Sequence, residues 1–342
     1  MKNIQIGVVV FITLLVVSVV LADFPDEPLT EFLLVDGTEI PLVDGADFSD
    51  KQLTGIAYRY NQPLVGVNFS ETRFYSFTFY DAILIDCDFS KAVLFNSHML
   101  CPNFKMKGPQ DTNNVATGMK GCNFTDAMLT RSSLVGINGK QLESTLNFTK
   151  YKDFSDCAFG SSDFSKVDFT GFDLRNTSFL EVKVDGANFT DAIIAGMRFR
   201  GRDPYNDESI VDIKIEQLLS TRDFKIGLVK NVSIPKITWP DHTIDLSNMV
   251  FIDCQFGRVP VTLDENREKY LPDYNAIKKL PDSVFAKIDL TDSIISGCNL
   301  EHLLGLTLEN IKSTWNYKHN RMEGIKLPEE IQKALDAEKD EQ

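Results

Sequence analysis

The side chains most able to do chemistry in this sequence are its carboxylates, which recur at a regular interval. There are 49 Asp and Glu residues against 35 Lys and Arg, and carboxylates can serve as the acids and bases of a polysaccharide-cleaving enzyme. Several Asp residues share one position, directly before a large apolar residue: Asp47, Asp88, Asp163, Asp168 and Asp173. A repeat that places an acid at this position brings acids close together whether or not they have a catalytic role. We therefore predict no catalytic residues and no enzymatic activity.

The six cysteines suggest disulfides if the protein is exported, but their positions favour another role. Five of them stand two residues before a large apolar residue, at a position that points inward and prefers small side chains: Cys87, Cys122, Cys157, Cys254 and Cys298. Buried thiols behave as small hydrophobic groups, so we predict core thiols and no systematic disulfide framework. Cys101 is out of phase, and one irregular bridge between Cys101 and Cys122 stays open.

Metal and cofactor sites are not indicated by the remaining reactive side chains. The four histidines, at positions 98, 242, 302 and 319, are scattered. His98 and Cys101, with Met99 and Met106 nearby, supply two strong ligands, whereas a closed zinc site needs four. No glycine-rich phosphate loop, nucleophile elbow or HExxH motif occurs. We predict neither a metal nor a cofactor.

The positions of these side chains are set by a five-residue period, which neither a helix nor a strand of period two produces. The period holds for ten steps from Phe154 to Phe199 and returns in shorter runs at 48–58, 64–104, 124–134, 246–256 and 285–300. The large residue at the centre of each unit is predicted to point inward and form the core: Phe69, Phe79, Phe89, Phe124, Phe154, Phe159, Phe164, Phe169, Leu174, Phe179, Phe189, Phe199, Phe251, Phe256, Leu290 and Leu300.

Two stretches, Gly186-Ala187-Asn188-Phe189-Thr190 and Asp81-Ala82-Ile83-Leu84-Ile85, match the A(D/N)LXX motif, so the chain resembles the pentapeptide-repeat proteins. The resemblance implies an all-β solenoid: a right-handed quadrilateral β-helix with four units per coil, short helical insertions and a C-terminal capping helix. Residues twenty positions apart should then stack about 4.8 Å apart. That places Phe159, Phe179 and Phe199 in one column, Phe169 over Phe189, and Phe69 over Phe89.

The repeats divide the chain into segments. We expect an amino-terminal cap at 23–45, the main β-helix at 46–201 with a polar insertion at 105–118, and a helix-turn-strand insertion at 202–245. Further repeats follow at 246–304 with an insertion at 260–284, and 305–342 hold a second copy of the insertion motif, a capping helix at 328–335 and an acidic tail. The two copies, 215–221 and 308–314, are offset by 93 residues. One continuous stack and two separate stacks both fit.

The first 22 residues have the features of a secretory signal peptide. Lys2 supplies a positive start, residues 6–21 are almost entirely apolar, and small residues precede a cut between Ala22 and Asp23. This predicts a secreted or periplasmic protein. The alternative is an uncleaved membrane anchor, because the apolar stretch is close to the shortest length that spans a bilayer.

Six N-x-S/T sequons arise mostly because the repeat places Asn before the central residue and Ser or Thr after it, and they matter only in a eukaryotic host. They begin at Asn68, Asn123, Asn147, Asn176, Asn188 and Asn231.

The net charge of −14 argues against nucleic acid as a direct ligand, because phosphate binding needs clustered Lys and Arg. The leading hypothesis is an exported, non-enzymatic scaffold that presents an acidic rod to an unknown protein partner, with 105–118, 203–243 and 260–283 as contact surfaces. The family resemblance implies an alternative, a DNA-mimicking protein that binds topoisomerases. A third reading is a membrane-anchored surface or adhesion element.

Overall fold

The computed structural model describes residues 31–33, 39–58, 63–80, 83–100, 119–200, 213–234, 237–257, 261–263, 270–272 and 282–340. The predicted signal peptide, its cut after Ala22, Cys101 and the insertion at 105–118 lie outside these residues. Among the described residues, no helix is both long and apolar enough to cross a membrane.

The fold is a parallel β-solenoid, as predicted. Its main sheet has 11 strands, with β20-β16-β13-β12-β11-β10-β8-β5-β7-β9 as the longest path and β3 paired to β5. These strands are β3 (Gln52–Tyr58), β5 (Arg73–Tyr80), β7 (Val93–Phe95), β8 (His98–Leu100), β9 (Met128–Thr130), β10 (Ser133–Val135), β11 (Ala158–Gly160), β12 (Ser178–Leu180), β13 (Arg198–Arg200), β16 (Ser233–Ile234) and β20 (Gln255–Phe256).

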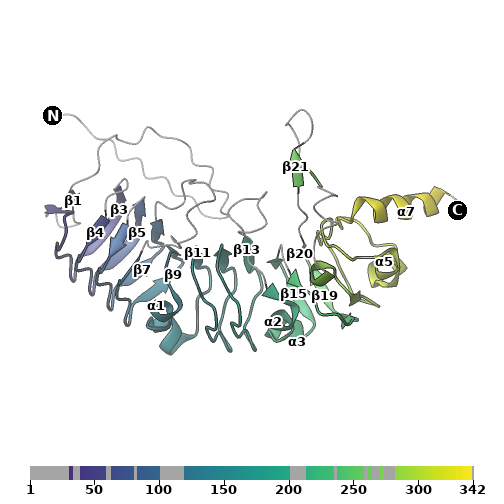
Figure 1. The fold of residues 1–342 in the computed structure, drawn as a ribbon, viewed down its shortest axis with the longest axis horizontal. Coiled ribbons are helices and arrows are strands. Elements are labelled where there is room, and N and C mark those ends of the chain that lie inside the picture. Colours follow the sequence, from purple (N-terminus) through teal and green to yellow (C-terminus); the bar gives the residue numbers. More distant parts are fainter. Residues whose placement is uncertain are drawn as a thin grey trace.

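The stack is continuous from one end to the other. Bridges from Gln255 to Asn299 and from Asn299 to Lys326 extend the ladder beyond β20, so one stack rather than two fits the molecule. Figure 1 shows the coils following one another along a shallow arc from β1 to α7. The question that the sequence left open is therefore answered.

Smaller sheets complete the other sides of the coils, and two antiparallel pairs lie outside them. Four are parallel pairs: β4 (Pro63–Val65) with β6 (Ile83–Ile85), β14 (Ile213–Lys214) with β17 (Ile237–Thr238), β15 (Leu228–Lys230) with β19 (Val250–Ile252), and β18 (Ile244–Asp245) with β23 (Ile288–Asp289). Two are antiparallel: β1 (Glu31–Leu33) with β2 (Glu39–Pro41), and β21 (Val261–Leu263) with β22 (Tyr270–Pro272).

The core is formed by the central residues, stacked in columns. Phe159 pairs with Phe179 and Phe179 with Phe199. The rings of Phe69 and Phe89 stack at 4.9 Å, and those of Phe169 and Phe189 at 5.4 Å. The predicted columns are thus confirmed. Burying each such side chain contributes roughly 1.5–3 kcal/mol before entropy is subtracted.

All of the predicted central residues that were named above are buried, except Phe256, which is half-buried and packs against the core. The prediction that Phe285 is the first inward residue of the run at 285–300 is wrong. Phe285 is only half-buried, and Ala286 beside it is buried instead. A 3-10 helix (Asp282–Val284) ends directly before Phe285, whose N–H bonds back to the Asp282 carbonyl at 3.0 Å, whereas the Ala286 N–H bonds to the Leu304 carbonyl of the next coil at 2.8 Å.

Helices occupy a few corners and the C-terminal end. They are α1 (Gly139–Glu143), the π-helix η2 (Asn147–Tyr151), α2 (Ile215–Leu219), α3 (Arg222–Lys225), the 3-10 helix η4 (Asp282–Val284), α5 (Leu308–Ser313), α6 (Trp315–Lys318) and α7 (Glu329–Asp340). Helix α7 starts after Pro328 and buries Ile331 and Leu335 at the end of the core. The capping helix that we predicted at 328–335 is therefore present, and it extends five residues further.

Candidate interaction surface: three helical corners

The repeated carboxylates are engaged in holding the backbone of their own turns. The Asp47 carboxylate accepts the backbone N–H of Ser49 at 2.9 Å, and Asp168 accepts that of Thr170 at 3.0 Å. The Ser49 backbone N–H lowers the pKa of Asp47, while the hydroxyl and then the N–H of Thr170 lower that of Asp168. Asn68, Asn123 and Asn188 make the same bond two residues on. The repeat thus uses Asp and Asn as turn residues, which needs no catalytic explanation.

The cysteines that share the inward position are all buried. Cys122 follows Cys87 in the same column, since the bridge between Asp88 and Asn123 places the two residues on neighbouring rungs. Burial raises the pKa of Cys157 to about 12, which makes it an inert core group. The alternative bridge between Cys101 and Cys122 stays a prediction, because Cys101 lies outside the described residues.

His98, Met99, Cys101 and Met106, for which we predicted no metal site, are only partly described by the structure. His98 lies on β8, where burial lowers its pKa, and Met99 beside it belongs to the core. Cys101 and Met106 are outside the described residues. No group of three or more His, Cys, Asp or Glu side chains suited to a metal is found in the part of the chain that the structure describes.

The clearest departure from the regular solenoid is a helical corner that occurs three times. We name the segments corner 1 (138–152), corner 2 (214–227) and corner 3 (307–320). Each begins with a residue in extended conformation. Asn138 with Gln141 and Thr307 with Asn310 form capping boxes, whereas corner 2 has only the return bond, from the Lys214 backbone N–H to Gln217 Oε1 at 2.9 Å. Each then carries a Ser-Thr pair and a buried Asn or Asp.

Corners 2 and 3 are recognisable in the sequence as a duplication, whereas corner 1 was not predicted. In the sequence, corner 1 stands out only as an interruption of the five-residue period. A signal was present, because Gln141-Leu142 is followed by Ser144-Thr145 in the same spacing as Gln217-Leu218 and Ser220-Thr221. The offset is 76 residues rather than 93.

The amide at the third helical position ties each corner to the coil before it. Gln141 Nε2 donates to the carbonyls of Met119 and Cys122 at 2.8 and 2.9 Å. Gln217 Nε2 donates in the same way to Val184 and Ala187, at 3.0 and 2.9 Å. In corner 3 the shorter Asn310 reaches Ile288 at 2.7 Å. All three helices therefore sit on the same side of the solenoid.

A buried side chain fixes the second half of each corner. Asn147, Asp223 and Asn316 accept the backbone N–H of Leu129, Ile194 and Ile295 respectively, each at 2.7 Å. The two asparagines also donate, to Asp153 and Arg321 carbonyls among others. Asp223 has no amide to donate, and burial raises its pKa.

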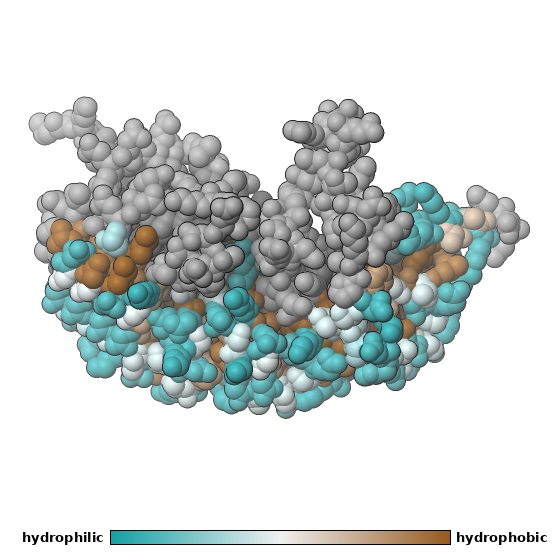
Figure 2. All heavy atoms as spheres, in the orientation of Figure 1, coloured by the Kyte–Doolittle hydropathy of each residue, from teal (hydrophilic) through white to brown (hydrophobic). Residues whose placement is uncertain are grey.

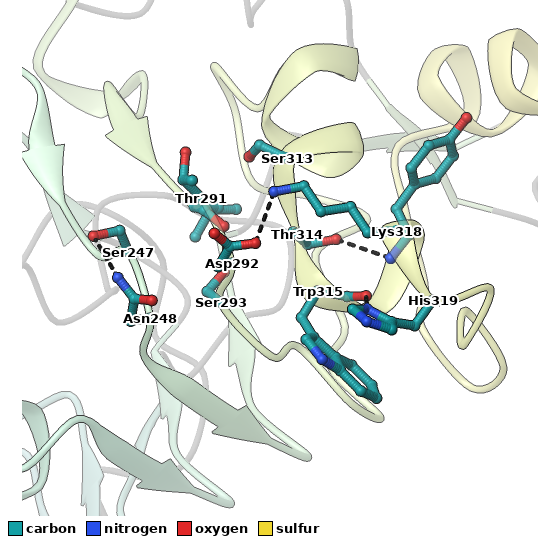
Figure 3. Close-up of polar contacts among 12 residues, drawn as sticks. Ser247, Asn248, Thr291, Asp292, Ser293, Ser313, Thr314, Trp315, Lys318 and His319 are labelled. Carbon is teal, nitrogen blue, oxygen red and sulfur yellow. Dashed lines mark hydrogen bonds and ion pairs between the residues drawn. The ribbon is translucent and has the colours of Figure 1, made fainter.

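The outer side of each corner carries one exposed large hydrophobic residue. Tyr151, Ile226 and Trp315 are 50%, 65% and 36% exposed, and they are three of only six such residues in the described part of the chain. In corner 3 the His319 ring stacks on Trp315 at 4.3 Å, and Lys318 pairs with Asp292 at 2.7 Å (Figure 3). Lys225 pairs with Asp191 in the same way in corner 2.

The predicted contact surfaces are only partly covered by the structure. The range 203–243 contains corner 2, and 260–283 contains the β21–β22 pair, which rises from the stack in Figure 1. The described surface is mostly hydrophilic along the edge opposite β21, and hydrophobic groups gather near the N-terminal coils and beside α7 (Figure 2). Corner 1 lies outside all three ranges that the sequence favoured.

An apolar cavity of about 30 Å³ lies inside the last coils. Its lining is entirely apolar and includes Trp239, Leu246, Leu290 and Cys298. All of the residues that line the cavity belong to the C-terminal part of the core, between Ile215 and Leu303.

Comparison with known proteins agrees with this architecture. The fold places the protein in the class of parallel β-solenoids in which each side of a coil takes five residues. Residues 153–191 match the family model described as pentapeptide repeats, in eight copies. The chain therefore carries pentapeptide repeats, and the resemblance predicted from its sequence is confirmed. None of the curated proteins matches the chain.

The solved structures that are similar to it include the following two. Full-length QnrB1, a plasmid-mediated fluoroquinolone resistance protein, is 13% identical, with 84% of this chain and 98% of that one covered and a TM-score of 0.23. HetL, involved in heterocyst differentiation regulation in the cyanobacterium Nostoc sp. strain PCC 7120, is 15% identical, with 77% and 90% covered and a TM-score of 0.17. At these scores the likenesses carry no argument about function.

Proposed function

We propose that the protein is an exported, non-enzymatic scaffold that presents an acidic rod and its helical corners to a protein partner. The observation that carries this proposal is that the polar and the large hydrophobic side chains of the protein have different roles. The polar groups of the repeat are engaged in turns and capping bonds, whereas large hydrophobic side chains are exposed at the corners. Such exposed residues on a rigid support are typical of contact sites rather than of catalysis.

Charge supports a protein partner over a nucleic acid. The chain has a net charge of −14, and phosphate backbones are bound by clustered cations. Several of the cations on the described surface are also paired with carboxylates of the chain itself, including Lys91 with Glu71 and Arg175 with Asp173. An acidic surface of this kind repels polyanions and stays soluble.

The first test is cell fractionation, with the mature amino terminus identified by mass spectrometry. The proposal expects a chain that starts at Asp23 in a soluble exported fraction. Tagged protein is then cross-linked in extracts of that compartment, and an excess of untagged protein serves as the competing control. A mature protein that captures nothing competable there would contradict the scaffold role.

The same experiment separates the alternatives. An intact Met1 in the membrane fraction would replace the soluble scaffold with an anchored surface or adhesion element. An intact chain in the cytoplasm would remove export altogether and favour the DNA-mimicking alternative. A supercoiling assay with DNA gyrase would then show whether the purified protein inhibits or protects the enzyme.

A further inference from the structure

The three corners are evenly spaced along the rod. Corner 1 precedes β11, corner 2 precedes β16, and corner 3 precedes Lys326 in the same ladder. Three steps of the ladder separate β11 from β16 (through β12 and β13), and three more lead through β20 and Asn299 to Lys326. At about 4.8 Å per step, successive corners stand roughly 14 Å apart.

They also lie on one edge of the rod. The Gln141 and Gln217 amides bond the same two carbonyl positions of the preceding coil, and Figure 1 shows α1 and the α2–α3 pair along the same margin. Each helix replaces part of one side of a coil, so its axis runs across the rod. One exposed hydrophobic residue marks each corner, namely Tyr151, Ile226 and Trp315.

The charges of corners 1 and 3 are inverted at matching positions. Lys140 and Glu143 stand at the second and fifth helical positions of α1, where α5 has Glu309 and Lys312. The formal charges of corners 1, 2 and 3 are +2, +1 and +1, against −14 for the whole chain. The corners are therefore less acidic than the chain as a whole, so this edge escapes the repulsion that its net negative charge imposes on close approach elsewhere.

We propose that these corners form the contact between two copies of this chain, arranged antiparallel about a two-fold axis through corner 2. Even spacing makes the edge symmetric end to end, so corner 1 meets the partner's corner 3 while corner 2 meets its own copy. The two-fold axis runs across the rods, in the same direction as the corner helices. Rotation about it therefore leaves the direction of these helices unchanged, and facing helices are parallel. Equal helical positions then meet, which pairs Lys140 with the partner's Glu309. This inference does not depend on the proposed scaffold role.

The most exposed hydrophobic residue lies on the corner that the axis crosses. Ile226 is 65% exposed and faces its counterpart near the axis, and apolar side chains are enriched at the centres of interfaces.

The test is sedimentation equilibrium of the purified protein at several concentrations. The wild type is expected to dimerise, and Ile226→Asp, which places two carboxylates near the axis, is expected to weaken dimerisation by about tenfold or more. The matched control is Val43→Asp, because Val43 is 51% exposed and lies away from the corners. Equal circular dichroism spectra and melting temperatures of the two variants establish that both are folded.

Charge reversal provides a specific second readout. Lys140→Glu and Glu309→Lys are each expected to weaken the dimer, and the double variant is expected to restore it, which no loss of folding can mimic. An Ile226→Cys variant is expected to cross-link as a dimer under mild oxidation, whereas Val43→Cys is not. A protein that stays monomeric throughout, or a dimer that Ile226→Asp does not weaken, would overturn the proposal. So would a double charge variant weaker than either single one.

Discussion

The first two thirds of the rod and its last coils use the same ladder but fill it differently. In residues 48–199, which we call the aromatic stack, most central residues are Phe, and rings meet along and between columns at distances such as 5.4 Å for Phe179 and Phe199. In residues 213–327, the aliphatic stack, the central residues are mainly Ile, Leu and Val, among them Ile234, Leu290 and Ile295. The cavity of about 30 Å³ is lined only by residues of the aliphatic stack.

The coils of the aliphatic stack leave part of their interior unfilled, where smaller side chains occupy the central positions. A void forfeits the dispersion contacts of the atoms that line it. We therefore expect the aromatic stack to be the more stable part of the rod and the aliphatic stack to open first.

The largest expected effect comes from truncating a central ring in the aromatic stack. Phe179 is fully buried and its ring meets those of Phe159, Phe164, Phe169 and Phe199. Phe179→Ala should cost about 3–5 kcal/mol of the free energy of unfolding. In the aliphatic stack, Phe256 is half-buried and lines the cavity, so Phe256→Ala should cost at most about half as much. Urea unfolding followed by circular dichroism measures both, and equal costs would contradict the comparison.

Enlarging a core side chain tests the same contrast in the opposite direction. Leu174 is fully buried in the aromatic stack, and Leu290 lines the cavity. Leu174→Phe should cost about 1–3 kcal/mol because a larger side chain at a fully buried position displaces its packed neighbours. Leu290→Phe enters existing space and should change stability by less than about 1 kcal/mol. Melting temperatures of the two variants, measured side by side, rank them; a greater loss at Leu290 would mean that the cavity does not accept the ring.

A smaller effect is expected where the two stacks meet, at the buried Asp223 of corner 2. Its pKa is raised by burial, so the folded protein holds this proton more tightly than the unfolded chain does. The contribution of Asp223 to stability therefore falls as the pH rises through and above the ordinary Asp range. Asp223→Asn supplies the neutral amide found in corners 1 and 3 and should gain about 1 kcal/mol at pH 7. Unfolding of both proteins at pH 4 and pH 7 measures the change.

The gain should shrink at pH 4, where Asp223 itself is closer to neutral. Asn147→Asp in corner 1 is the matched reciprocal variant, because it introduces a carboxylate into the same buried position. It should lose stability at pH 7 and recover part of it at pH 4. A gain from Asp223→Asn that is larger at pH 4 would contradict the assigned cause.

The sequence predicted the regular parts of the rod because a five-residue period dictates which side chains point inward. The columns of Phe159, Phe179 and Phe199 and the buried position of Cys157 follow from the phase alone. The shift from Phe285 to Ala286 could not be foreseen, because the phase of Leu290, Ile295 and Leu300 points to Phe285 and does not reveal the 3-10 helix that ends directly before it.

Corner 1 was missed because its sequence departs from the other two copies. Gly139 stands where they have Ile215 and Leu308, and Thr149 replaces Lys225 and Lys318. What defines the corner is a bond across 22 residues, from Gln141 to the Met119 carbonyl, which no local pattern reveals. The even spacing of the three corners depends on how many coils lie between them, and only the folded ladder supplies that number.

The smallest effect, and the most direct comparison of the two stacks, concerns the order in which buried thiols become reactive. Burial raises the pKa of Cys157 to about 12, and hydrogen bonding with Cys254 raises that of Cys298, so neither thiol should be alkylated by iodoacetamide in the native protein at pH 8. In urea below the main transition, Cys298, which lines the cavity, should be labelled before Cys157, because partial opening begins in the aliphatic stack. Peptide mass spectrometry of timed samples gives both rates. Simultaneous labelling would mean that the rod unfolds as one cooperative unit, and earlier labelling of Cys157 would place the weak region in the aromatic stack.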